Sequence, residues 1–170
     1  VNKINSLSEI IDKYDLFLID QWGVIHSGQK GYSFAINCIE QLYKFKKKLI
    51  IISNSSKRKN STIDNLQSIG FNKDHFFEIM TSGEMIWKEL NFKSHKFIKK
   101  LGKNCFHLTN KEKKDGSSFQ EGLEYNFVDN LDKADFILGC TTSPELTTLD
   151  YIPFLEKAIN KNLPFICANP

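Results

Sequence analysis

The sequence predicts an α/β protein with a doubly wound, Rossmann-like parallel sheet. Two observations predict it. Short apolar runs typical of buried strands alternate along the chain with segments of helical periodicity. The first run, Leu16 to Ile19, ends abruptly in Asp20, and the second, Leu49 to Ile52, ends in Ser53-Asn54. Polar residues directly after buried strands are typical of the sheet edge where α/β proteins bind ligands.

The first half of the chain contains the clearest alternation. Apolar spacing predicts helices around residues 7–11, 35–43, 63–69 and 85–90, and strands at 16–20, 49–52 and 76–79. Ser6 or Ser8 is the expected cap of the first helix. Gly70 follows the third helix at the position where a left-handed residue is needed to end it.

The composition changes near Asn91, and we place a domain boundary near Phe92. Residues 1–91 then form the N-terminal part of a core domain, and residues 92–170 form a second, smaller α/β unit. Its expected strands are 105–108, 125–128, 136–140 and 164–167, with a polar loop at 111–118. Its expected last helix has Asp150 as N-cap, Pro153 in the first turn, and a buried face made of Ile152, Leu155 and Ile159.

Charge and cysteine content exclude several function classes. The net charge of +3, from 23 basic and 20 acidic side chains, is too small to indicate a nucleic-acid partner. The four cysteines form no CxxC pair, so neither a zinc site nor a disulfide framework is expected. No apolar run approaches the roughly 20 residues that span a bilayer, and the polar start is unlike a secretory signal. We therefore expect a soluble, cytoplasmic protein with no membrane partner.

The two strand ends together suggest phosphoryl chemistry. A carboxylate at Asp20 can attack phosphorus, while the Ser53 hydroxyl and nearby backbone N–H groups hold the phosphoryl oxygens. A divalent cation is needed to reduce the repulsion between carboxylate and phosphate, and Mg²⁺ suits a site with few protein ligands. The alternative interpretation is that Asp20 merely begins a surface turn.

These motifs resemble those of the haloacid dehalogenase-like (HAD) superfamily of aspartate-nucleophile phosphatases. Asp20-Gln21-Trp22-Gly23-Val24 and Ile52-Ser53-Asn54 resemble its first two motifs. The class IIA branch, with a large α/β cap inserted after the second motif, is similar in further stretches, namely residues 22–28, 81–83, 134–138 and 164–170. The resemblance implies a Rossmann-like HAD core with an inserted α/β cap, incomplete at the C-terminus.

The resemblance also implies roles for individual residues. Asp20 matches the nucleophile that becomes an aspartyl phosphate and also binds Mg²⁺. Ser53 matches the hydroxyl that binds the transferring phosphoryl group, and Asn54 and Gly23 lie in the adjoining substrate-binding loops. The backbone carbonyl of Trp22 matches a metal ligand. The expected function is Mg²⁺-dependent hydrolysis of a small phosphomonoester.

Two departures from the family pattern weaken that expectation. The family's phosphatases usually carry a second Asp two residues after the nucleophile, as general acid and base, where this chain has Trp22. Losing a positioned acid or base typically costs about 10²–10⁴ in rate. The third and fourth motifs would lie beyond Pro170, and the chain's start at Val1 and end after an apolar run resemble a cut. We therefore expect the fragment alone to be inactive.

Alternatives to a phosphatase remain open. Trp22 is also compatible with a non-catalytic relative that binds a phosphorylated metabolite or a partner protein. A phosphoacceptor signalling domain likewise needs an aspartate at a sheet edge. Trp22 can stack on a substrate or close the site against water, and His26 can carry protons or simply pack a turn. Residues 140–145 can reach a substrate, and cap surfaces can form a homodimer.

Overall fold

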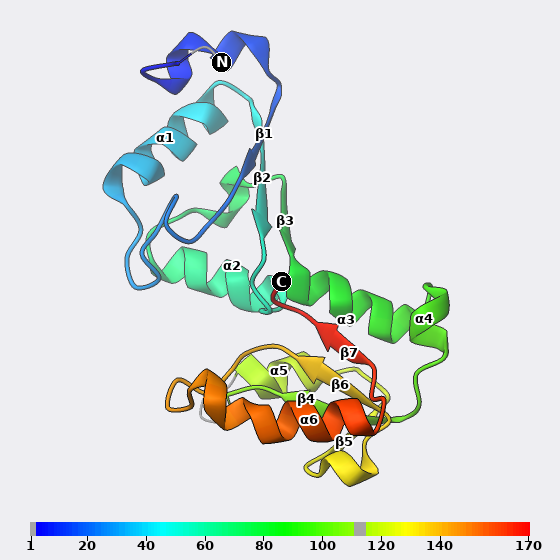
Figure 1. Cartoon of the computed structure of the whole chain (residues 1–170). Coiled ribbons are helices and arrows are strands. Elements are labelled where there is room, and N and C mark those ends of the chain that lie inside the picture. Colours follow the sequence, from blue (N-terminus) through cyan, green and yellow to red (C-terminus); the bar gives the residue numbers. More distant parts are fainter. Residues whose placement is uncertain (1–2, 111–114) are drawn as a thin grey trace. The chain divides into compact units, whose positions relative to one another are not determined.

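The computed structural model describes residues 3–110 and 115–170 (Figure 1). Its contacts divide the chain into unit 1, which is Val1–Ser53 with Lys59–Thr81, and unit 2, which is residues 54–58 with Ser82–Pro170. The separation falls before the helix α3 (Ser82–Phe92), whereas the sequence places the boundary after it, near Phe92. The assignment of 1–91 and 92–170 to a core and a cap stays a prediction.

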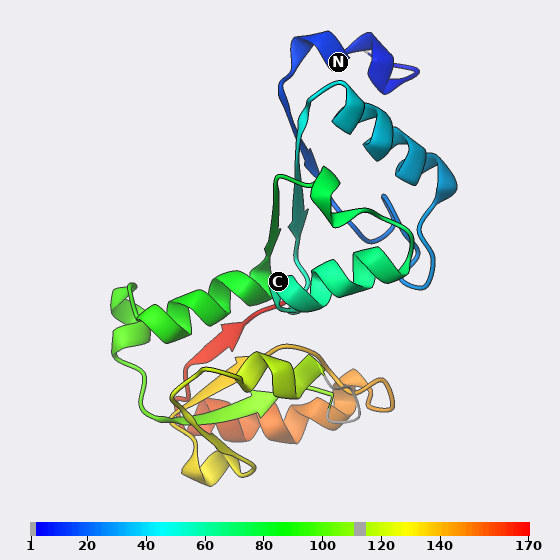
Figure 2. The ribbon, with the colours of Figure 1, turned by 180° about the vertical axis from the view of Figure 1, so that it is seen from behind.

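Unit 1 is a parallel sheet with two helices on one face. Its strands are β1 (Leu16–Ile19), β2 (Lys48–Ser53) and β3 (Glu78–Thr81), in the order β1-β2-β3. The connecting helices α1 (Ser33–Lys44) and α2 (Lys59–Ser68) lie on the same side of the strands (Figures 1 and 2). This follows from right-handed crossovers that both step in the same direction across the sheet.

The core of unit 1 lies between this sheet and its two helices. It is made of buried side chains from the sheet and from both helices, including Ile39, Leu42, Leu49, Ile51, Leu66 and Ile79. Phe71 and Phe76 close it at the end where the turn η3 (Lys73–His75) enters β3. On the opposite face, Leu18, Ile52 and Met80 are exposed. The helix-covered face therefore buries most of the apolar area in the part of unit 1 that the structure describes, while Ile50 is half-buried on the opposite face.

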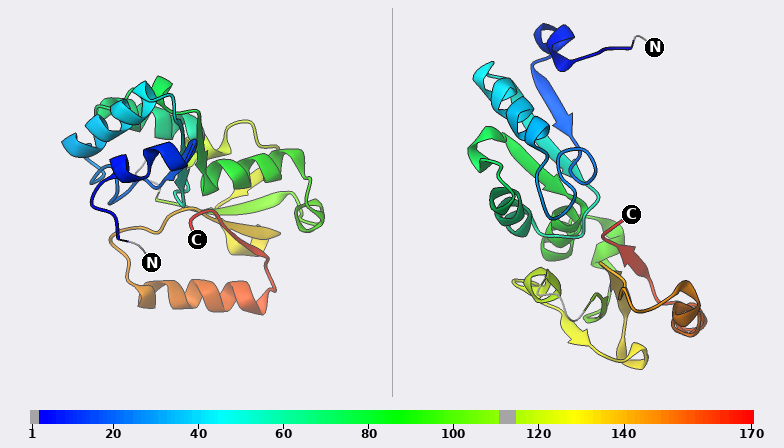
Figure 3. Two further views of the ribbon diagram at one scale, coloured as in Figure 1. Left: turned by 90° about the horizontal axis from the view of Figure 1, so that it is seen from above. Right: turned by 90° about the vertical axis from the view of Figure 1, so that its left-hand side faces the viewer.

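Unit 2 has helices on both faces of a second parallel sheet. Its strands are β4 (Asn104–Leu108), β5 (Asn126–Val128), β6 (Phe136–Gly139) and β7 (Phe165–Cys167), in the order β5-β4-β6-β7. The helices α3, α4 (Lys96–Lys99) and α5 (Asp115–Gln120) bring Leu90, Ile98 and Phe119 against one face. The helix α6 (Ile152–Asn160) covers the other face (Figure 3, left). The α/β fold with parallel sheets is therefore confirmed.

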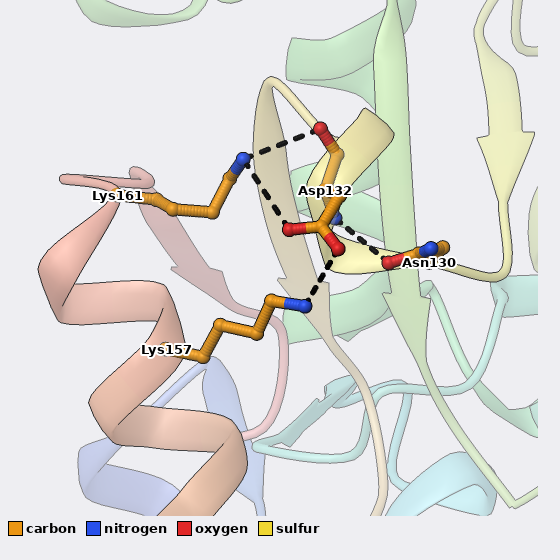
Figure 4. A network of polar contacts seen from close by, with 4 residues as sticks. All are labelled: Asn130, Asp132, Lys157 and Lys161. Carbon is orange, nitrogen blue, oxygen red and sulfur yellow. Dashed lines mark hydrogen bonds and ion pairs between the residues drawn. The ribbon is translucent and has the colours of Figure 1, made fainter.

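An ionic network fixes α6 to the turn that precedes β6 (Figure 4). The turn η4 (Leu131–Lys133) carries Asp132, whose Oδ2 accepts a hydrogen bond of 2.7 Å from Lys157 Nζ. Lys161 Nζ donates to the Asp132 carbonyl at 3.2 Å, and Asn130 Oδ1 accepts the Asp132 N–H at 2.9 Å. The hydrogen bond from Lys157 lowers the pKa of Asp132. Because the network is exposed, it orients α6 more than it stabilises it.

Most strands and helices lie where the sequence predicts them, but several details differ. The expected first helix is two 3₁₀ turns, η1 (Leu7–Glu9) and η2 (Ile11–Lys13), and Ser6 makes no cap hydrogen bond. Gly70 has the expected left-handed conformation, with φ +104°. Residues 111–114 of the expected polar loop lie outside the described residues, and the rest of it forms part of α5.

The predicted N-cap and the predicted buried face of α6 are both wrong. Thr147, not Asp150, is the N-cap of the turn η5 (Thr148–Tyr151), and Asp150 Oδ2 accepts hydrogen bonds from the Thr147 N–H and hydroxyl at 2.7 and 2.6 Å. Pro153 is in the first turn, as expected. The expected buried side chains are exposed, namely Ile152, Leu155 and Ile159. Ala158 is buried instead, and Phe154, one turn earlier on the same face of the helix, packs against the same core.

The helices in the described part of the chain are not membrane-spanning helices. Among residues 3–110 and 115–170, no helix combines the length and the apolarity that crossing a bilayer requires.

The core of unit 2 contains one polar group that is incompletely satisfied. His107, on β4, is 8% exposed and lies between the rings of Phe119 and Phe127. Its Nδ1 shares a hydrogen bond of 3.0 Å with Gln120 Nε2, while its Nε2 has no hydrogen-bond partner among the described residues. Burial lowers the pKa of His107 to about 4, so the ring is neutral at pH 7.

Acidification from pH 7 to pH 4 is therefore expected to destabilise unit 2. Between the unfolded pKa of about 6.5 and the folded pKa of about 4, only the unfolded state takes up the His107 proton, so stability falls as pH falls. The loss is at most about 3 kcal/mol. Urea titrations over this pH range can follow Trp87 fluorescence in a Trp22→Phe background, because the chain has two tryptophans. His107→Leu should show a shallower pH dependence, and an unchanged dependence contradicts the assignment.

Candidate functional site

Three strand ends meet at the carboxyl edge of the unit 1 sheet. The register pairs Ile19 with Ile51 and Ser53 with Thr81, so Asp20 lies opposite the residue before Ser53. Neighbouring strands are about 4.8 Å apart in such a sheet. The predicted nucleophile and the predicted phosphate-binding hydroxyl are therefore presented from adjacent strands at one edge.

Asp20 is exposed at this edge, and one of its two carboxylate oxygens is held by a hydrogen bond. Its Oδ1 accepts the backbone N–H of Gln21 at 2.7 Å. Beside it is an open hollow of about 390 Å³ with mostly apolar lining, including Leu18, Val24 and Phe34. The carboxylate thus has a fixed rotamer, an accessible position and an apolar wall on one side.

The loop after Asp20 is closed by its own backbone and by His26. Gly23 has φ +80°, a conformation that favours glycine, and its N–H donates to the His26 carbonyl at 2.9 Å. His26 is 5% exposed, and its Nδ1 accepts the Gly28 N–H at 2.9 Å. These contacts favour the packing interpretation of His26 over the proton-carrier interpretation.

Trp22 is the most exposed large side chain of this loop. It is 73% exposed, and its indole lies against Gly28, where an added Cβ would come within 3.1 Å of Trp22 Nε1. The ring therefore lies along the loop backbone with most of its surface open. No titratable group stands at this position, which the resemblance assigns to the acid and base.

Asn54 is engaged differently from Ser53. Its amide nitrogen donates to the carbonyl of Pro170 at 3.2 Å, a contact within unit 2. The structure therefore uses the Asn54 side chain to hold the chain beyond β7. The substrate-binding role of Asn54, like those of Ser53 and Gly23, stays a prediction.

The loop at 140–145 offers mainly exposed polar side chains. Cys140 itself is buried, and burial raises its pKa to about 12, so its thiol is neutral and poorly nucleophilic. The Ser143 N–H donates to the Tyr151 hydroxyl at 2.8 Å. Any contact of this loop with a substrate would come from the residues after Cys140.

Sequence reasoning missed the residues that hold the chain after Ser53. Arg58 Nε donates to Glu84 Oε2 at 2.7 Å, and the Gly83 N–H donates to the Ser55 carbonyl at 3.0 Å. These partners are 26 or more residues apart in the sequence, and none belongs to a recognisable motif for such a contact. The only sequence signal is the glycine at position 83, two residues after the end of a strand.

The donor set at the sheet edge fits Mg²⁺. Among the residues that the structure describes, no three His, Cys, Asp or Glu side chains gather as a metal-binding group. Mg²⁺ does not need such a group, because it commonly keeps several waters and takes one or two carboxylates plus phosphate oxygens. The Asp20 carboxylate and the Trp22 backbone carbonyl are hard oxygen donors of this kind.

Solved structures of known proteins have the same fold. A haloacid dehalogenase-like hydrolase from Brucella suis aligns with a TM-score of 0.83 and 24% identity, over 98% of this chain and 60% of that chain. A glycerol phosphate phosphatase from Mycobacterium tuberculosis, in complex with magnesium, aligns with a TM-score of 0.63 and 16% identity, over 94% and 45%. A 4-nitrophenylphosphatase from Thermotoga maritima aligns with a TM-score of 0.61 and 20% identity, over 94% and 56%.

The chain therefore spans 45–60% of the length of these three proteins. The comparison with curated proteins gives no match. A family model described as haloacid dehalogenase-like hydrolase matches residues 17–101, which is half of the chain. The match includes all of β1 after its first residue, Asp20, and β2 with Ser53. The chain belongs to the haloacid dehalogenase-like hydrolase family.

Proposed function

We propose that the protein is a Mg²⁺-dependent phosphohydrolase that acts on a small phosphomonoester through an aspartyl phosphate. The observation that carries this proposal is the position of Asp20 and Ser53 at the ends of adjacent parallel strands, in a chain of this family. The proposal includes the class IIA branch, in which unit 2 supplies the cap.

The chemistry of the first step rests on Asp20. Its free carboxylate oxygen attacks phosphorus, the new O–P bond forms, and the ester P–O bond breaks with the electron pair leaving on the ester oxygen. The Gln21 N–H holds the other oxygen and so fixes the direction of attack. The Ser53 hydroxyl donates to a phosphoryl oxygen. In the second step, water attacks phosphorus and loses a proton to solvent, and the bond between phosphorus and the Asp20 oxygen breaks with its electron pair on that oxygen. Inorganic phosphate leaves, and the carboxylate is restored.

Mg²⁺ bound to the Asp20 carboxylate and the Trp22 carbonyl would supply charge neutralisation between carboxylate and phosphate. A magnesium complex is known for the glycerol phosphate phosphatase named above. The names of the similar structures, a glycerol phosphate phosphatase and a 4-nitrophenylphosphatase, also support a small phosphomonoester as the substrate class.

Trp22 sets the expected preference among esters. An indole neither protonates a leaving alkoxide nor activates water, so the leaving group must depart as a weak base. We therefore expect turnover of aryl phosphates and slow turnover of alkyl phosphates.

A second candidate function is supported by the same residue. A non-catalytic relative would keep the fold and the phosphate site, and the exposed indole of Trp22 would contact a bound metabolite or partner protein. Such a protein shows saturable stabilisation by a phosphorylated ligand with Mg²⁺ but releases no phosphate from any ester.

The proposal of a phosphohydrolase also includes a cytoplasmic location and a homodimer that forms through cap surfaces.

Asp20→Asn should abolish Mg²⁺-dependent release of p-nitrophenol from p-nitrophenyl phosphate by the complete protein. The amide is a poor nucleophile, and the expected loss is on the order of 10³-fold or more. Asp15→Asn is the matched control, because Asp15 lies at the other end of β1 and is fully exposed. Full activity of Asp20→Asn contradicts the proposal.

Trp22→Asp should create the missing acid and base. The rate for an alkyl ester such as glycerol phosphate is expected to rise by about 10²–10⁴, with a much smaller change for p-nitrophenyl phosphate. Trp22→Asn is the control, since it has the same size as Asp but carries no titratable proton. An equal gain in both variants, or none in Trp22→Asp, would show that position 22 does not face the leaving group.

A further inference from the structure

The segment that follows Ser53, residues 54–58, is held by the first two turns of α3. By its contacts this segment belongs to unit 2, together with α3. In the proposed reaction the same segment carries the backbone beside the phosphate-binding hydroxyl. The way α3 holds it therefore bears on how phosphate is bound.

Gly83 permits the closest of these contacts. An added Cβ at Gly83 would lie 2.0 Å from the Ser56 carbonyl oxygen and 2.8 Å from the Lys57 carbonyl oxygen. Both atoms belong to the backbone and cannot move away cheaply. The Gly83 N–H also donates to the Ser55 carbonyl at 3.0 Å. The absence of a side chain thus lets the backbone of 55–57 lie directly on the start of α3.

Arg58 forms the second contact, with Glu84, the residue next to Gly83, and with Trp87, one turn further along α3. Its Nε donates to Glu84 Oε2 at 2.7 Å, and the side chains are 19% and 12% exposed. The guanidinium lies over the indole of Trp87, 3.7 Å from the ring centroid. A charge-assisted hydrogen bond at this burial is stronger than a surface ion pair, because solvent screens it less.

Trp87 is itself fixed in place. Its Nε1 donates to the Glu121 carbonyl at 3.0 Å, and its ring packs against Gly122, where an added Cβ would come within 3.1 Å. The indole therefore lies between the backbone of residues 121–122 and the guanidinium of Arg58. Glu84 and Trp87 are both on α3. One helix therefore provides the carboxylate that pairs with the Arg58 guanidinium and the ring on which the guanidinium lies.

We propose that Gly83, Glu84 and Trp87 are positioning residues for the phosphate-binding loop 53–58. They fix the backbone on both sides of Ser55 through Gly83 and through Arg58, while the pairing of Ser53 with Thr81 fixes the start of the loop. The loop is thereby preorganised to bind the oxygens of a phosphoryl group. This inference rests on the proposed function, because it assigns these residues to the same phosphate site.

The test is the affinity of the complete protein for inorganic phosphate in the presence of Mg²⁺, measured by calorimetry beside the thermal midpoint. Glu84→Ala removes the acceptor of the Arg58 Nε–H and should raise the Kd for phosphate about tenfold, because hydrogen bonds to charged groups are worth more than neutral ones. Glu84→Gln keeps a neutral acceptor and should give a smaller rise, of about threefold.

Glu78→Ala is the matched control. Glu78 pairs with Lys59 within unit 1, so this variant removes a carboxylate from an ion pair that includes no residue of the loop 53–58 and no residue of α3. Its Kd for phosphate should stay within about twofold of the unmodified protein, even if its thermal midpoint falls. A merely structural role of Glu84 would lower the thermal midpoint and leave the Kd unchanged.

The outcomes separate this inference from the proposed function. If the unmodified protein binds phosphate and Glu84→Ala binds it equally well, or weakens it no more than Glu78→Ala does, the inference is overturned and the function stands. If Glu84→Ala does not fold, an unchanged Kd in Glu84→Gln overturns it instead. If the unmodified protein does not bind phosphate with Mg²⁺, the proposed function fails, and the inference fails with it.

Discussion

The parallel register of β1, β2 and β3 is the constraint on which the candidate site depends. It brings Asp20 and Ser53, which are far apart in the sequence, to adjacent positions at one edge of the sheet. The register is fixed by the alternation of side chains: Leu49 and Ile51 must face α1 and α2, and a shift by one residue would expose them. The same burial that stabilises unit 1 thus sets the distance between the two groups that the proposed reaction uses.

The loops beyond the strand ends are shaped by backbone contacts more than by side chains. After β1, the chain is closed by Gly23, by His26 and by the Gly28 backbone on which Trp22 lies. After β2, it lies on α3 at Gly83. These loops directly follow Asp20 and Ser53, the residues to which the proposed reaction assigns attack on phosphorus and phosphate binding. Side-chain chemistry at the site is correspondingly sparse.

The sequence predicts the local features well and the relations between distant residues poorly. Asp20 and Ser53 could be identified because each ends an apolar run, and Gly70 because it ends a helix. The N-cap predicted at Asp150 is at Thr147, and Asp150 accepts a hydrogen bond from the Thr147 N–H. Both residue types are good N-caps, so only the backbone conformation decides between them. The contact of Arg58 with Glu84 carries no local signal, and the glycine at position 83 alone does not show what approaches it, because both contacts depend on where the fold places α3.

The central claim is that Asp20 becomes covalently phosphorylated, and the most direct measurement is to trap that intermediate. The complete protein, turning over p-nitrophenyl phosphate with Mg²⁺, is quenched in acid and reduced with borohydride, which converts an aspartyl phosphate to homoserine. Peptide mass spectrometry then locates the modified residue. The account predicts homoserine at position 20 and an unmodified residue at Asp15. Steady release of phosphate without modification at position 20, or modification of another carboxylate, would contradict it.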